Sequence, residues 1–164
     1  MVGQILFILI AGATLLMALG VVLARNLFHA ALFLVGVFFG IAVLFILLEA
    51  EFLGAAQIII YIGAIATLIV FAIMLSKNVM GKEAGAYNNQ WLWALGGVIF
   101  LFLLLGWLLI QMPFKFVAAD VPEDAIAQIG QGFVGHYVVP FEVASVLLLV
   151  ALVGAIMLAR ERNS

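Results

Sequence analysis

The sequence predicts an all-α protein, an integral membrane bundle of five transmembrane helices. Of its 164 residues, 69% are hydrophobic and only 9% are charged. Soluble domains are about half apolar and a quarter charged, and a soluble core of this size could not hide so much apolar surface. Five separate stretches reach the roughly 20 apolar residues that a helix needs to cross a bilayer.

The first two spans are predicted at residues 2–24 and 27–48. Arg25 and Asn26 end the first, and Glu49 ends the second. The first apolar stretch has no basic residue before it and runs for about 23 residues, which is too long for the apolar region of a signal peptide. We therefore expect it to be a retained span.

The remaining spans are predicted at 52–75, 91–111 and 140–159. The connection 112–139 contains "EDAIAQIG", which we expect to form a short surface helix ended by Gly130. No internal repeat of the kind found in many carriers is evident. Residues 1–164 are therefore expected to form a single transmembrane domain.

The basic residues predict the orientation of the bundle. If five spans alternate, one side holds five of the six Lys and Arg residues, namely Arg25, Lys77, Lys82, Arg160 and Arg162. Only Lys115 falls on the other side. Because Lys and Arg concentrate in cytoplasmic loops, we expect the N-terminus outside and the C-terminus in the cytoplasm.

The third span carries hydrogen-bonding groups and glycines where plain aliphatic residues would suffice for lipid. Placed on an α-helix, its residues form three stripes: Gly54, Gln57, Tyr61, Ala64 and Leu68; Ala56, Gly63 and Thr67; and Ile58, Ile62, Ile65 and Ile69. Only the aliphatic stripe suits lipid. Small residues permit close helix approach, and an unpaired polar group in hydrocarbon costs several kcal/mol. We expect protein to enclose this helix on two sides.

Two interpretations of Tyr61 and Gly63 stay open at this point. Both residues lie near the bilayer midplane, about 15 Å deep. In the first, they form a tight helix crossing, with Tyr61 bonded to a neighbour's backbone. In the second, they mark a deformable point such as a π-bulge, beside a hydrated path lined by Tyr61 and Gln57.

No predicted span carries Asp, Glu, Lys, Arg or His at mid-depth. Intramembrane proton relays are normally built from such residues, so this chain alone lacks the usual parts of a pump. It has no cysteine, which excludes disulfides and thiol chemistry. Neither a phosphate-binding loop nor paired catalytic carboxylates are present, so we expect no catalytic, cofactor-binding or metal site.

Four further polar or special residues are candidates for a subunit interface or a helix start. We expect Pro140 and Glu142 in the first turn of the fifth span, where proline loses no hydrogen bond and an acid meets the positive end of the helix dipole. Glu142 could instead pair with a cation on an adjoining subunit. Ser145 could bond back to the helix carbonyls. His29 fits a capping or interface role better than metal ligation.

Three stretches carry a resemblance to a known family: "AEFLGAAQIIIYIGAIATLIVFAIML" in the third span, "YVVPFEVASVLLLVALVGAIMLAR" at 137–160 and, more weakly, "RNLFHAAL" from Arg25. Together they resemble chain J of proton-pumping NADH-quinone oxidoreductase, respiratory complex I. The resemblance covers all five spans in order. One departure is Leu27, where many relatives carry proline, and it concerns the start of the second span.

The resemblance implies a non-catalytic membrane-arm subunit that couples quinone reduction to proton translocation. It implies FMN, iron–sulfur clusters and quinone on other subunits, neighbours equivalent to chains K, A, H and N, and residence in the bacterial inner (plasma) membrane. It also implies a π-bulge in the third helix that interconverts with α-helix beside a water path. Tyr61 and Gly63 would belong to that switch, with Gln57, Ala64 and Thr67 near it.

Two rival functions differ from this one. A purely structural scaffold subunit would need no change of shape in the third helix. An independent small transporter would need the mid-membrane charge and the internal repeat that the sequence lacks.

Overall fold

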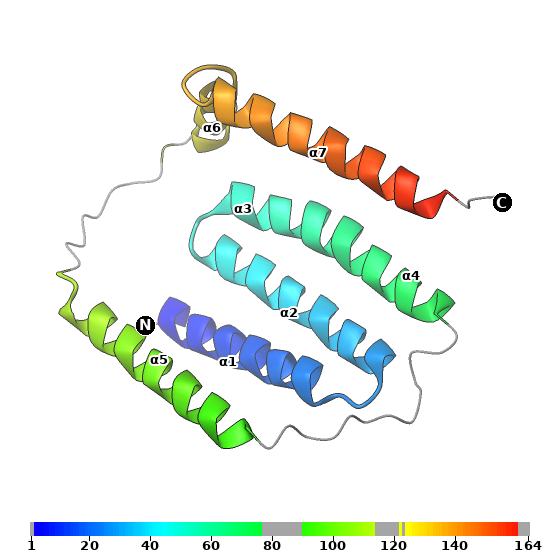
Figure 1. Cartoon of the computed structure of the whole chain (residues 1–164). Coiled ribbons are helices and arrows are strands. Elements are labelled where there is room, and N and C mark those ends of the chain that lie inside the picture. Colours follow the sequence, from blue (N-terminus) through cyan, green and yellow to red (C-terminus); the bar gives the residue numbers. More distant parts are fainter. Residues whose placement is uncertain (1, 77–89, 114–121, 123, 161–164) are drawn as a thin grey trace. The chain divides into compact units, whose positions relative to one another are not determined.

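The computed structural model describes residues 2–76, 90–113, 122 and 124–160. Throughout these ranges every regular element is helical. Five helices are long and apolar enough to cross a membrane: α1 (Val2–Leu23), α2 (Leu27–Leu47), the continuous rod Glu51–Leu75, α5 (Trp91–Gln111) and α7 (Val138–Ala159). The predicted five-span, all-α architecture is confirmed (Figure 1).

The contacts group the chain into two units, Met1–Ala118 and Ala119–Ser164. Each unit is described by itself, and the single domain stays a prediction. The orientation across the membrane also stays a prediction. Four of the basic residues on which it rests lie outside the described ranges: Lys77, Lys82, Lys115 and Arg162.

Helices α1 and α2 form a hairpin, and its second helix begins with an asparagine cap. The Asn26 side chain accepts a hydrogen bond of 2.8 Å from the Phe28 backbone N–H, which satisfies one of the free donors at the start of a helix. Because of this cap, α2 begins at Leu27 even though the residue is not the proline that many relatives carry there. The cap is Asn26 and not His29, so the capping role expected for His29 is wrong.

Glycines bring α1 and α2 close together. A Cβ atom at Gly36 would lie 2.6 Å from the Met17 sulfur, and one at Gly40 would overlap the Thr14 side chain. Gly36 and Gly40 are four residues apart, the spacing of the small-residue motif that lets membrane helices approach. Thr14 is buried, and its hydroxyl donates to the Ile10 carbonyl at 2.8 Å. No polar group of Thr14 is therefore left unpaired in the interface.

The turn after α2 is a Schellman motif with an unusual residue in it. Glu49 has a φ of 58°, and its N–H donates to the Ile46 carbonyl at 3.1 Å while the Ala50 N–H donates to Phe45 at 2.9 Å. Glycine usually fills this left-handed position. Glu49 is therefore an exposed turn residue that ends α2 and starts the third span.

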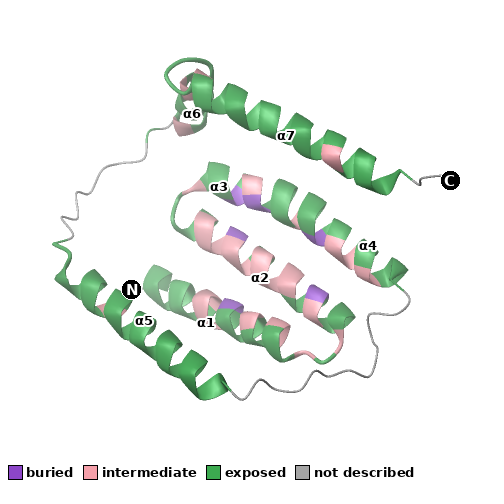
Figure 2. Cartoon of the chain, in the orientation of Figure 1, coloured by how far each residue is buried: buried purple, intermediate pink, exposed green. Residues whose placement is uncertain are grey.

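The third span consists of α3 (Glu51–Ala56), the π-helix η1 (Gln57–Ala66) and α4 (Thr67–Leu75). Its three parts pack on α2, which lies between them and α1 (Figure 1). The third span approaches α2 closely at Gly54, where a Cβ atom would lie 3.0 Å from Ile46 and 3.5 Å from the Ala42 carbonyl oxygen. Ala42 and Gly54 are both buried. Figure 2 shows that the buried residues gather on α1, α2 and this span, whereas α5 and α7 are almost wholly exposed.

The second unit contains the short helix α6 (Ala125–Val134) and α7. We expected the short helix to end at Gly130, but it continues to Val134. Glycine inside a helix costs about 1 kcal/mol relative to alanine, and the contact of Phe133 with Phe141 of α7, with ring centroids 5.9 Å apart, opposes that cost. Gly135 follows α6 as its C-cap residue.

Candidate functional site: the π-helical middle of the third span

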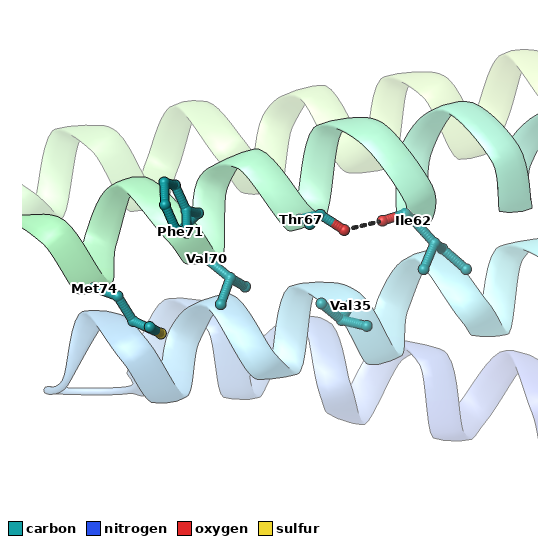
Figure 3. A pocket seen from close by; sticks show the side chains of 6 residues that line it. All are labelled: Val35, Ile62, Thr67, Val70, Phe71 and Met74. Carbon is teal, nitrogen blue, oxygen red and sulfur yellow. Dashed lines mark hydrogen bonds between the residues drawn. The ribbon is translucent and has the colours of Figure 1, made fainter.

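Ten consecutive residues, Gln57–Ala66, form the π-helix η1 in the middle of the third span. The backbone bonds of a π-helix join residues five apart, and longer π segments are rare. The Thr67 hydroxyl repeats this spacing, because it donates to the Ile62 carbonyl at 3.1 Å (Figure 3). A mid-membrane segment that carries the wider hydrogen-bond register therefore ends at a threonine that satisfies one of its carbonyls.

The π register decides which residues face α2. Gln57 and Ala66 are both buried, with exposed fractions of 6% and 1%. They are nine residues apart, which on an α-helix would be about two and a half turns and would put them on opposite sides. A π-helix needs somewhat more than four residues per turn, so nine residues make about two turns. The wider register thus keeps both residues on the side that packs on α2.

The stripes expected for an α-helix are therefore wrong beyond Tyr61. Ala64 is exposed and Leu68 is 68% exposed, although both were expected to continue the stripe of Gln57. Ile62, expected to face lipid, is half-buried instead. The prediction failed because it applied 100° per residue to a segment that turns less per residue.

Gln57 is a polar residue whose hydrogen bonds are not completed by the packing on α2. Its side chain is buried on α2, and within the described residues its amide makes no hydrogen bond. In that same part of the chain, no completely buried side-chain nitrogen or oxygen lacks a partner. The small exposed remainder of Gln57 is therefore its polar end, which can bond to water or to another subunit.

Tyr61 lies one turn further along, against α2. Its ring packs edge-on against Phe38, with centroids 5.4 Å apart and planes at 70°. The side chain is 44% exposed, and its hydroxyl makes no hydrogen bond to the described residues. The backbone bond expected for a tight crossing is therefore not made within these ranges. The sequence did not predict Phe38 as the partner of Tyr61, because Phe38 is one apolar residue among many in the second span.

Gly63 is not at a close helix contact. Of the atoms that a Cβ there would meet, only the Ile58 carbonyl oxygen lies within 4 Å, at an ordinary 3.5 Å. Gly63 and its neighbour Ala64 are both exposed. The tight crossing of this span is at Gly54, so packing within this unit does not explain the glycine at position 63.

An apolar hollow of about 260 Å³ adjoins the end of the π-helix (Figure 3). It lies between α2 and the third span, and Val35, Ile62, Thr67, Val70, Phe71 and Met74 line it. Because the Thr67 hydroxyl is already bonded to Ile62, the hollow offers little hydrogen-bonding capacity. The polar ends of Gln57 and Tyr61, and not this hollow, are the places where water could bind.

The second group of candidates lies at the start of α7, and one expectation there is wrong. α7 begins at Val138, so Pro140 is its third residue, where its missing N–H still costs no helical bond. Glu142 then falls in the second turn, away from the free N–H groups. The helix starts early because the turn after α6 already orders the chain, with the Tyr137 N–H bonded to the Gly132 carbonyl at 2.8 Å.

The remaining two candidates have simple local roles. The Ser145 hydroxyl donates to the Glu142 carbonyl at 2.7 Å, which confirms that it bonds back to the helix. His29 is exposed in the first turn of α2, with its ring edge-on to Phe28 at 6.3 Å. The interface role of His29 stays a prediction.

Comparisons with known proteins place the chain in a family. Residues 17–158 match the model of the NADH-ubiquinone/plastoquinone oxidoreductase chain 6 family. NAD(P)H-quinone oxidoreductase chain 6 of Synechocystis sp. is 39% identical over 98% of this chain and 82% of the relative. The Leptolyngbya boryana chain 6 is 41% identical, over 94% and 78%. Subunit J of the F(420)H(2) dehydrogenase of Methanosarcina mazei is 37% identical, over 96% and 91%.

The family indicated by the sequence motifs is the same as the family of the matched segment and of these relatives. The matched segment includes α2, the third span and α5 completely, α7 except for its last residue, and α1 from residue 17 onward. The chain therefore belongs to the NADH-ubiquinone/plastoquinone oxidoreductase chain 6 family, and it is a membrane subunit of an oxidoreductase of the complex I type.

Proposed function

We propose that this chain is a non-catalytic coupling subunit of a redox-driven proton pump, and that its third span works by changing between π- and α-helix. The single observation that carries the proposal is the π-helix at Gln57–Ala66. It occupies the segment in which the sequence places Tyr61 and Gly63. Gly63 is exposed and free of close contacts, so its backbone can change register without a clash inside this unit.

The physical effect of such a change is a rotation of α4. In the π form, Gln57 and Ala66 share the α2 side. In an α form, Ala64 and Leu68 would follow Gln57 on that side, because seven and eleven residues are close to whole numbers of α turns. Ala66 would move by close to half a turn. The side chains next to Gln57 on the α2 side would therefore change from Ala66 to Ala64 and Leu68.

Rotation can make or break a chain of bound water. Gln57 and Tyr61 supply an amide and a hydroxyl without partners in the described residues, and both types of group bind water well. An aliphatic side chain rotated next to them would interrupt a hydrogen-bonded path. Because no span carries a mid-depth charge, subunits equivalent to chains K, A, H and N would supply the titrating groups.

The redox groups belong elsewhere in the proposed complex. Cluster iron is usually held by cysteine thiolates, and this chain has none, so its donor set does not fit an iron–sulfur cluster. We likewise propose that FMN and quinone bind to other subunits. The complex would reside in the plasma membrane of a bacterium, with NADH, ferredoxin or reduced deazaflavin as electron donor.

Two structures of the whole complex would test the proposal, one at rest and one trapped during turnover. We expect Gln57–Ala66 to be π-helical in one state and at least partly α-helical in the other, with Leu68 facing different neighbours. A segment that keeps one register in both states would leave the chain as a structural scaffold. The broad exposed faces of α5 and α7 would serve a scaffold equally well, so this comparison is the decisive one.

A further inference from the structure

Helix α6 has one apolar and one polar side. Ile126, Ile129 and Phe133 recur at spacings of three and four residues, which puts them on one face. Gln128 and Gln131 lie on the opposite face. No residue from Ala125 to Val134 is charged, and the Gln128 amide donates to Asp124 just before the helix at 2.9 Å. The helix is thus amphipathic through apolar and amide groups alone.

A short turn fixes α6 to the beginning of a membrane span. Gly135, His136 and Tyr137 are the only residues between α6 and α7, and two backbone bonds close the turn: Tyr137 N–H to Gly132 at 2.8 Å and Val138 N–H to Gly135 at 3.3 Å. With 22 residues, α7 is about 33 Å long, close to the thickness of the hydrocarbon layer. The start of α7, and with it the end of α6, therefore lies at the edge of that layer.

An aromatic contact joins the apolar side of α6 to the first turns of α7. Phe133 of α6 meets Phe141 of α7 with ring centroids 5.9 Å apart. Phe141 is the fourth residue of α7, about 5 Å along the span from its start. The apolar face that contains Phe133 is therefore held at the depth where acyl chains begin. The exposed Tyr137 and His136 mark the boundary, where amphipathic rings are common.

Part of the apolar face of α6 is exposed. Ile126 is 57% exposed and Phe133 is 40% exposed. Next to them is a largely apolar hollow of about 440 Å³ along α6. It is lined by Pro122, Ala125, Gln128, Ile129, Gly132, Phe133 and Tyr137, so Gln128 borders it at the edge of the polar face. A hollow of this size at the edge of the hydrocarbon layer fits part of an acyl chain.

We propose that α6 is an interfacial helix that lies on the membrane surface, with Ile126, Ile129 and Phe133 among phospholipid acyl chains. Binding of this kind depends on apolar burial. Without a Lys or Arg on α6, attraction to anionic headgroups contributes nothing. The partner is therefore the acyl and glycerol region of any phospholipid, whatever its headgroup.

Photo-crosslinking in the intact complex, in its native membrane, tests this assignment. A photoreactive benzoylphenylalanine replaces Ile126 in one variant and Gln131 on the polar face in a matched control. Intact-mass analysis of the subunit identifies the adduct. We expect a phospholipid adduct at Ile126 in at least several-fold excess over Gln131, and equal yield in membranes rich or poor in anionic lipid.

Three results would overturn the proposal: an adduct with another subunit at position 126, no adduct there, or equal lipid adducts at both positions. Benzoylphenylalanine at Ile129 gives the same readout if the variant at position 126 does not assemble. The test does not measure pumping, so it stands or fails separately from the proposed switch.

Discussion

The α1–α2 hairpin and the third span use mid-membrane glycine in opposite ways. Gly40 lies where a Cβ atom would overlap Thr14, and Gly36 lies against Met17. A Cβ atom at Gly63 would meet only one atom within 4 Å, at an ordinary distance. The hairpin glycines allow two helices to touch, whereas Gly63 lies in a π-helix without a close neighbour from another helix of this unit. The same residue thus marks a close helix contact in one region and open space in the other.

The largest effect is expected from a change at the close contact between α1 and α2. Gly40→Val inserts a branched side chain where even a Cβ atom overlaps Thr14, and overpacking of this kind costs about 1–3 kcal/mol or more. We expect most of the assembled complex to be lost, measured as subunit recovered with its partners after mild-detergent purification.

A compensating change shows whether this loss comes from the Thr14 contact. Gly40→Ala alone should destabilise the hairpin, and Gly40→Ala with Thr14→Ala should recover part of the loss, because the second change removes the hydroxyl, which is the closest facing atom, and the methyl group, and leaves only the Cβ atom at 3.0 Å. Equal stability of the single and double variants would contradict the close contact as its cause.

The second prediction concerns Gly63 in the π-helix. Gly63→Val should leave assembly partly intact and impair proton pumping and quinone-linked turnover severalfold. A bias of about 1 kcal/mol between two helical registers changes their ratio roughly fivefold. Pumping is measured as dye quenching in vesicles, alongside quinone-linked turnover.

Gly97→Val is the matched control, because Gly97 lies in the regular helix α5 and a Cβ there meets nothing within 4 Å. It should pump normally once assembled. Unchanged pumping in Gly63→Val would reject the switch.

The third prediction concerns the turn that joins the two regions. Glu49→Gly should stabilise the turn between α2 and the third span by about 1 kcal/mol, because the left-handed φ of 58° is costly for a residue with a side chain. The measurement is the thermal unfolding midpoint of the complex. Glu49→Gln removes the charge but keeps the side chain, so a gain of equal size in this variant would mean that charge and not backbone conformation sets the effect.

The smallest effect is expected from Tyr61→Phe, which tests whether the backbone or a side chain matters more at the π-helix. Tyr61→Phe keeps the ring contact with Phe38 and removes only the hydroxyl. We expect a milder loss of pumping than in Gly63→Val, since another water can replace one hydroxyl in a hydrated path. A larger loss than in Gly63→Val would make the Tyr61 hydroxyl, and not the register change, the main element of the site.

Sequence reasoning succeeded where a residue's role follows from its own segment. The five spans, the polar Gln57 and the Ser145 hydroxyl bond could all be predicted from local composition and spacing. It failed where a neighbour decides the outcome. Gly130 was expected to end α6, but the contact of Phe133 with Phe141 accompanies a longer helix. Glu142 was expected in the first turn of α7, which begins earlier than Pro140 suggests.

What the sequence by itself determined is that this chain crosses a membrane five times, because transfer of about 20 apolar residues into hydrocarbon depends on composition alone. Only the tertiary structure decided the register of the third span. Local propensity favours the α-helix, since π segments are rare and short, so the π register could not be predicted from the residues of this span alone. Packing on α2 accompanies the π register, since only the wider turn brings Gln57 and Ala66, nine residues apart, to the same buried side.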